Sequence, residues 1–377
     1  MFDKKSYILL ILLLLLTFGN SYAEENIPSI KPYGFIKVDM AIDETRTNSG
    51  NYVFNVKLPD QAHGKDGEFN MTARQTRLGA NLLYDEIKDR IISARFEFDF
   101  FGGGAENKNL PMLRHAFFKV DLGKYYLLAG QTSDIISPLV PSTVNYTVLW
   151  NCGNIGYRHP QFQFGNIVTN GVEIVGSLSR NISGDIDDDG NDDGEDSSLP
   201  VVQGRLSYIN PEVNIGVSGH YGKMEYRNGL PKDKHYTTYS VNLHASYILT
   251  HALSIKGEAF TGKTLNQYFG GIGQGFNYQL EKEVESTGGW INAALKAHNN
   301  ITCNLGIGID QPQKHNKLSF PSINLNKCMF ANIYTNVAHN TSFAIEISKW
   351  TTGYYDNAGN DLNISNLRVQ TAFILNI

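Results

Sequence analysis

Residues Ile92–Phe101 read ISARFEFDFF, and along this stretch apolar and polar side chains alternate with a period of two. The apolar face consists of Ile92, Ala94, Phe96, Phe98 and Phe100, and the polar face consists of Ser93, Arg95, Glu97 and Asp99. This period predicts a strand with one face in apolar and one face in polar surroundings. A single strand of this kind fits a soluble sandwich as well as a membrane barrel, so the fold depends on how often the pattern recurs.

The same alternation returns about every twenty residues up to the end of the chain, as in transmembrane β-barrels. With loops placed at clusters of Gly, Pro, Asn and Asp, it predicts sixteen strands. They are Tyr33–Asp43, Ala73–Tyr84, Ile92–Phe101, Leu113–Asp121, Tyr125–Gln131, Arg158–Phe164, Val172–Ser179, Pro200–Tyr208, Val213–Tyr221, Thr238–Tyr247, Leu253–Gly262, Ser286–Ala297, Ile301–Asp310, Lys327–Val337, Thr341–Trp350 and Asn366–Ile377. Short and long connections alternate, which is typical of outer-membrane barrels with short periplasmic turns.

The N-terminus has the features of an export signal. Lys4 and Lys5 form a basic region, residues 8–16 form an apolar run, and Ser21-Tyr22-Ala23 is a cleavage site of the small-x-small type. The apolar run is too short to cross a bilayer as a helix, because a crossing helix needs about 20 residues. We therefore expect residues 1–23 to be removed near Ala23. Residues 24–377 then form one all-β domain, an up-and-down antiparallel transmembrane barrel of about 16 strands whose first and last strands pair.

Net charge is concentrated in one loop. The whole chain carries −5, and removal of Asp3, Lys4 and Lys5 with the signal leaves −6. Residues 185–196 hold seven Asp and one Glu, which is −8, so the rest of the mature chain is about +2. The spacing of Asp185, Asp187, Asp189, Asn191, Asp193 and Asp196 matches the oxygen ligands of a Ca²⁺ loop. A solvated acidic external loop without metal is the alternative, because no flanking helices are predicted.

The predicted polar faces, which line the lumen, carry more cations than anions. The cations are Lys37, Arg77, Arg95, Lys119, Arg158, Arg205, Lys256, Lys296 and Arg368, and the anions are Asp39, Glu97, Asp99, Glu258 and Glu346. An excess of fixed positive charge raises the local concentration of anions in a pore. We expect a narrow zone with Arg77, Arg95 and Arg158 opposite Glu97 and Asp99. In the alternative interpretation, these charges pair across strands and only brace the wall.

The connection Thr132–Tyr157 is long and rich in Ile, Leu, Val and Tyr. A segment this apolar is poorly suited to extend into water. Two placements remain open: the segment folds into the barrel and narrows it, or it packs outside against neighbouring loops or a partner subunit.

The three cysteines give no reason to expect a structural disulfide or a metal site. Alternation places Cys303 toward lipid and Cys328 toward the lumen, so these two side chains point apart. Cys152 lies in the long connection, and no CxxC spacing is present.

Nothing in the sequence indicates an enzyme. No G-x-S-x-G, HExxH or phosphate-binding Gly-rich motif is present. His115, His220 and His244 are placed in the lumen on three different strands, and we interpret them as polar lining.

Six short motifs occur in the order found in one family. They are Tyr33–Asp39 (YGFIKVD), Ala73–Gly79 (ARQTRLG), Phe96–Gly102 (FEFDFFG), Leu113–Phe117 (LRHAF), Gly130–Thr132 (GQT) and Arg158–Gln161 (RHPQ). With them the chain resembles the DcaP-like outer-membrane porins, closely in its first half and only as strand pattern in its second half. The chain departs from such barrels at Ile377, where a terminal aromatic residue is commoner. The periplasmic coiled coil of some members is also missing between Ala23 and the first strand.

The resemblance implies a homotrimeric channel that passes small anionic solutes such as dicarboxylates, with Arg77, Arg95 and Arg158 at the constriction. Together with the register, we expect the pore to be lined by Arg77, Arg95, Arg158, Glu97, Asp99, Lys37, Lys119 and Arg205. The expected location is the outer membrane of a Gram-negative bacterium. Lipid with lipopolysaccharide, small solutes and further copies of the chain are the expected partners, and nucleic acid is not. The alternatives are a general or phosphate-type porin, and a structural or adhesive barrel with a plugged lumen.

Overall fold

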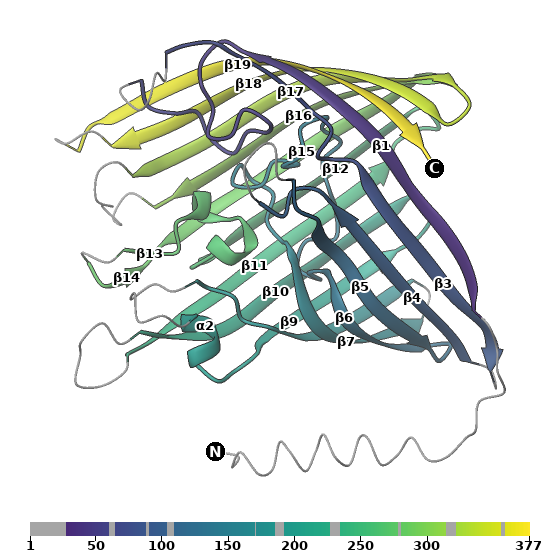
Figure 1. The fold of residues 1–377 in the computed structure, drawn as a ribbon. Coiled ribbons are helices and arrows are strands. Elements are labelled where there is room, and N and C mark those ends of the chain that lie inside the picture. Colours follow the sequence, from purple (N-terminus) through teal and green to yellow (C-terminus); the bar gives the residue numbers. More distant parts are fainter. Residues whose placement is uncertain are drawn as a thin grey trace.

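The first and last strands of the chain pair with each other, so the sheet closes on itself (Figure 1). The computed structural model describes residues 28–59, 65–87, 90–103, 109–169, 171–184, 192–226, 234–277, 280–313, 322–355 and 359–377. The predicted signal peptide lies outside these residues. In Figure 1 the purple β1 (Ser29–Asp43) runs beside the yellow β19 (Asp361–Asn376), and Phe35–Asp43 pair with Arg368–Asn376.

The strands between these two follow each other around the barrel, each antiparallel to its neighbour. They are β2 (Glu68–Thr72), β3 (Arg77–Ile87), β4 (Arg90–Asp99), β5 (Met112–Asp121), β6 (Tyr125–Ser133), β7 (Arg158–Thr169), β8 (Val172–Ser179), β9 (Val201–Ile209), β10 (Val213–Tyr226), β11 (Lys234–Ile248), β12 (Leu253–Lys263), β15 (Glu285–His298), β16 (Ile301–Pro312), β17 (Ile323–Ala338) and β18 (Thr341–Tyr355). Because β2 and β3 share one position beside β1, the 17 strands of the sheet form a barrel of 16 positions. The predicted fold class is confirmed.

The second predicted strand, Ala73–Tyr84, is wrong in its first part. Residues 73–76 form a turn between β2 and β3, in which the Thr76 amide donates to the Ala73 carbonyl at 2.9 Å. Asp39 pairs with Thr72 and Phe35 with Arg77, so three residues of β1 face four residues of the neighbouring chain. One extra residue of this kind is a bulge, which alternation alone does not reveal.

Short elements outside the barrel wall are few in the described part of the chain. They are the hairpin β13 (Phe276–Asn277) and β14 (Lys282–Glu283), the one-turn helix α2 (Asp193–Asp196), and the 3-10 turns η1 (Asn266–Tyr268) and η2 (Gly271–Gly273). No helix among the described residues has the length and apolar character needed to cross a membrane.

The two faces of the sheet differ as the alternation predicts. On β4, Phe96 is 47% exposed on the outer face, whereas Glu97 and Asp99 on the inner face are 4% and 0% exposed. The polar side chains are buried because loop segments lie against them inside the barrel (Figure 1). An apolar outer face and a polar inner face are the arrangement that a lipid bilayer requires.

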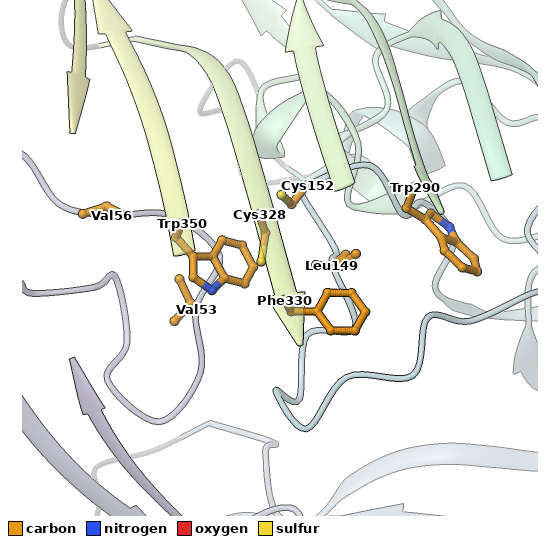
Figure 2. Close-up of a cluster of buried hydrophobic side chains, with 8 residues drawn as sticks. All are labelled: Val53, Val56, Leu149, Cys152, Trp290, Cys328, Phe330 and Trp350. Atoms are coloured by element: carbon orange, nitrogen blue, oxygen red, sulfur yellow. The ribbon is translucent and has the colours of Figure 1, made fainter. Parts of the chain in front are cut away.

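Part of the inner wall is apolar and packs against these loop segments. Trp290, Cys328, Phe330 and Trp350 on β15, β17 and β18 form one buried cluster with Val53, Val56, Leu149 and Cys152 from two connections (Figure 2). The cluster fixes residues 44–59 and 134–157 to the part of the barrel wall formed by β15, β17 and β18. Backbone contacts add to it, since the Val56 amide donates to Thr352 Oγ1 at 2.9 Å.

The seam between β1 and β19 contains a buried ion pair whose removal should weaken barrel closure. Arg368 Nη1 lies 2.6 Å from Asp43 Oδ2, and both side chains are at most 1% exposed. Arg368→Met leaves the Asp43 carboxylate without its partner, which costs about 3–5 kcal/mol for a buried pair. We expect the temperature at which the purified barrel loses its β-sheet circular dichroism to fall.

The double variant Asp43→Asn/Arg368→Met removes both charges and should recover much of this loss. Lys349→Met, on the outer face of β18, is the matched control. Equal unfolding temperatures for Arg368→Met and the control would contradict the role of the seam pair.

Candidate functional site

Residues 134–157 lie inside the barrel, which decides between the two placements left open by the sequence. Inner-wall side chains bind the backbone of this segment, which we call the constriction segment. Glu258 Oε1 accepts from the Leu139 amide at 2.8 Å, and Glu346 Oε2 accepts from the Val144 amide at 2.7 Å. A buried loop needs such partners, because unpaired backbone groups away from water are costly.

The neck of the constriction segment is closed by Asp134. Its amide donates to the Tyr157 carbonyl at 3.0 Å, and its carboxylate accepts from the Tyr157 amide at 2.8 Å. His159 Nδ1 lies 2.9 Å from the same carboxylate. Burial on its own raises the pKa of Asp134, but His159 and the hydrogen bonds from Gln203 and Tyr157 bring that pKa below its ordinary value. Asp134 therefore stays ionised and holds the two ends of the segment together.

The tip of the segment, residues 147–154, rests directly on the wall. Val148, Leu149 and Asn151 have left-handed backbone conformations, and the Cys152 amide donates to the Leu149 carbonyl at 2.9 Å. A Cβ added at Gly308 on β16 would lie 2.2 Å from the Cys152 carbonyl oxygen. Glycine at this position therefore lets the two backbones approach closely.

A group of charged side chains lies on the adjacent strands β3, β4 and β5. Glu97 Oε1 lies 2.8 Å from Arg114 Nε and 3.4 Å from Arg77 Nε, and Asp99 Oδ2 lies 2.6 Å from Arg114 Nη1. Glu97 and Asp99 thus pair with arginines on neighbouring strands. The sequence-based placement of Glu97 opposite Arg77 is wrong, because the two side chains lie side by side on neighbouring strands.

Arg114 is the residue of this group that sequence reasoning missed. Alternation assigns it to the lipid face because His115 points inward. A bulge between β4 and β5 changes this, since Glu97 pairs with His115 and Phe98 with Leu113, which leaves Arg114 as the extra residue. Arg114 is 8% exposed and contacts Glu97 and Asp99.

Arg158, the first residue of β7, differs from the other arginines. Its guanidinium carbon lies 4.5 Å from the centre of the Tyr157 ring and 5.4 Å from that of Trp150. The residue is 5% exposed, and its Nε and Nη2 atoms have no hydrogen-bond partner. No ion pair joins it to a carboxylate in the described part of the chain. Its positive charge is therefore uncompensated, as the sequence-based hypothesis for the constriction requires.

The other predicted pore-lining cations are mostly paired. Lys37 lies 3.1 Å from Asp39, Lys119 lies 3.2 Å from Asp121, and Arg205 lies 2.9 Å from Glu173. These distances favour the bracing interpretation for the three residues.

Arg95 is exposed and forms no ion pair with a carboxylate among the described residues. Its Nε donates to Asn81 Oδ1 at 2.9 Å. Its guanidinium carbon lies 5.4 Å from the centre of the Tyr33 ring. Of the three predicted constriction arginines, Arg77 shares Glu97 with Arg114, whereas Arg95 and Arg158 form no ion pair among the described residues.

The predicted calcium ligands are only partly within the described residues. Asp185, Asp187, Asp189 and Asn191 lie outside them, and Asp193 and Asp196 form the ends of helix α2, whose N-cap is Asp192. Among the described residues, no three His, Cys, Asp or Glu side chains gather as metal ligands. Calcium binding stays a prediction.

A closed barrel of 16 positions with a connection folded into its lumen defines a porin-type channel of the outer membrane. The family model described as DcaP outer membrane protein matches residues 22–269, and the chain belongs to this family. The resemblance predicted from the ordered motifs is confirmed. The family and the fold are those of channels and not of enzymes.

Solved structures share the fold over nearly the whole chain. The crystal structure of the outer membrane channel DcaP of Acinetobacter baumannii matches with a TM-score of 0.76 and 14% identity, covering 95% of this chain and 100% of that chain. The anion-selective porin from Comamonas acidovorans gives 0.65 and 11%, with 93% and 100% covered. OmpT of Vibrio cholerae in its trimer form gives 0.56 and 8%, with 93% and 99% covered. A sequence comparison with curated proteins found no match.

Close packing of the segment tip on the wall leads to a prediction for pore size. In Gly308→Ala the new methyl group collides with the Cys152 carbonyl, so the tip must shift away from β16. We expect a changed single-channel conductance in planar bilayers, because the segment lies in the lumen.

Gly204→Ala on β9 is the matched control, since a Cβ there meets no atom within 4 Å. If both variants conduct like the wild type, the tip does not restrict the pore.

Proposed function

We propose that this channel passes small hydrophilic anions by passive diffusion, with dicarboxylate-like solutes as its preferred class. The observation that carries the proposal is Arg158, whose charge no carboxylate among the described residues compensates. Its Nε and Nη2 donors have no partner but are buried, so Arg158 acts on a passing solute carboxylate through its positive charge.

The neighbouring arginines neither strengthen nor cancel this field, because they are paired with carboxylates. Arg77 and Arg114 share the carboxylates Glu97 and Asp99, so this group of four is close to neutral as a whole. Arg158 then adds one positive charge next to them. A second carboxylate on the same solute could exchange with Glu97 as the partner of Arg77, since Arg77 Nε and Glu97 lie 3.4 Å apart without a hydrogen bond.

The similarity of fold to solved porins supports two further parts of the proposal. The Comamonas acidovorans relative is an anion-selective porin, and the Vibrio cholerae relative has a trimer form. We propose that this chain also assembles as a homotrimer in the outer membrane. Each subunit then forms its own pore, because each barrel closes on itself.

A general porin without strong charge preference is the second candidate. The observation that favours it is that Lys37, Lys119 and Arg205 are each paired with a carboxylate. In that case only cations without a carboxylate partner, such as Arg158 and Arg95, give the pore a weak selectivity.

The proposal predicts that Arg158→Gln weakens anion selectivity. At about 5 Å in water one unit charge contributes about 0.8 kcal/mol, which attracts an anion and repels a cation by about fourfold each, so the anion-to-cation permeability ratio should fall roughly sixteenfold. The measurement is the reversal potential of the purified mature protein in a planar bilayer under a KCl gradient.

Arg180→Gln removes the same charge where the side chain is exposed and paired with Glu195, and it serves as the control. Cation selectivity of the wild-type protein would overturn the proposal. Absence of any current would favour the plugged structural barrel.

A further inference from the structure

Cys152 occupies a fixed place against the inner wall. It is 0% exposed, and its thiol donates to the Gly308 carbonyl oxygen at 3.6 Å. A Cβ added at Gly308 would overlap the Cys152 carbonyl at 2.2 Å. The backbone carbonyl of Cys152 therefore occupies the space that a side chain at position 308 would take.

Cys328 lies beside Gly308 on the adjacent strand β17. It pairs directly with Gly308 in the register of β16 and β17, faces the lumen and is 1% exposed. Side chains that face each other on adjacent antiparallel strands lie about 4.5–5.5 Å apart at Cβ. A residue that takes the place of the Gly308 side chain is thus within reach of the Cys328 side chain.

A second contact sets the position of the segment tip along β17. Asn326 Nδ2 donates to the Asn151 carbonyl at 2.8 Å. Asn326 precedes Cys328 by two residues on the same face of the strand, and Asn151 directly precedes Cys152. The hydrogen bond therefore holds Cys152 in line with Cys328.

Both cysteines belong to the same buried apolar cluster (Figure 2). Burial raises the pKa of the Cys152 thiol well above its ordinary value, and the backbone of Cys328 lowers it.

We propose that Cys152 and Cys328 form a disulfide that ties the constriction segment to the barrel wall. The sequence-based expectation of no structural disulfide compared Cys328 with Cys303, whose side chain points to the opposite face of β16. The structure brings Cys328 together with Cys152 instead. All three cysteines are thiols in the structure.

The bond requires an oxidant, and an outer-membrane protein meets one during export. Disulfide-carrying thiol oxidoreductases of the periplasm exchange their own disulfide with a substrate dithiol. Cys152 and Cys328 would lose two protons and two electrons as the sulfur–sulfur bond forms, and the oxidant would become a dithiol. A buried, protonated thiol reacts poorly. We therefore place the reaction before the barrel closes over the cluster, and the finished disulfide should resist external reductants.

A thiol count on the full mature protein tests the proposal. Cells are lysed in denaturant that contains N-ethylmaleimide, so that every free thiol, buried or exposed, is blocked, and the protein is then purified in the unfolded state. Released thiols are then labelled with a maleimide–polyethylene glycol after reduction, so that each former disulfide sulfur adds one mass step in gel electrophoresis. The expected result is two added labels, with Cys303 blocked at lysis, and a Cys152–Cys328 linked peptide in mass spectrometry of unreduced protein.

Single variants separate this bond from other pairings. Cys152→Ser and Cys328→Ser should each abolish both labels, whereas Cys303→Ser should leave both in place. Incubation of the folded protein with dithiothreitol should leave the linked peptide intact, and unfolding should make it reducible. No label on wild-type protein, or a linked peptide that contains Cys303, would overturn the proposal.

Discussion

Closure of the sheet between β1 and β19 is the constraint on which the rest of the structure depends. In a closed barrel every strand has two hydrogen-bonded neighbours, so no backbone edge faces lipid. Closure also gives each side chain one of two surroundings, the bilayer or the lumen. Many exposed apolar side chains, such as Ile42 at 61% and Leu305 at 64%, belong to the outer face. The polar side chains must then find partners inside.

Those partners come from two sources, and this determines how much charge is left for a solute. Inner carboxylates on β12 and β18, Glu258 and Glu346, bind the backbone of the constriction segment. Carboxylates nearer the chain's first strands pair with cations, as Asp39 does with Lys37. A simple count of inner charges therefore overstates the field in the pore, because most cations have a carboxylate within ion-pair distance. What remains is set by the few groups without such a partner.

The strands could be predicted from the sequence because alternation is a local property of each strand. All sixteen predicted strands correspond to positions in the barrel, and the predicted inner faces hold for β4, β9 and β18. One-residue insertions could not be predicted in the same way, because they depend on pairing between strands. Arg114 did carry a signal: a charged residue at a lipid-facing position of a regular strand is costly, which itself indicates a bulge. Contacts of the constriction segment carried no local signal, since its partners lie up to 226 residues away in the sequence.

The inner wall is divided into two parts with different tasks, and the division is visible in the side chains themselves. On β15, β17 and β18 the inner face carries Trp290, Phe330 and Trp350, which are at most 4% exposed beneath the loop segments. Large apolar side chains would be unfavourable if they faced a water-filled lumen. This part of the wall therefore packs against the loop segments and holds them in place. On β3 and β4 the inner face keeps Arg77 and Arg95, and these side chains retain exposure to water. Because the constriction segment is fixed to the apolar part, its position relative to the arginines is set by packing on strands a few positions further around the barrel.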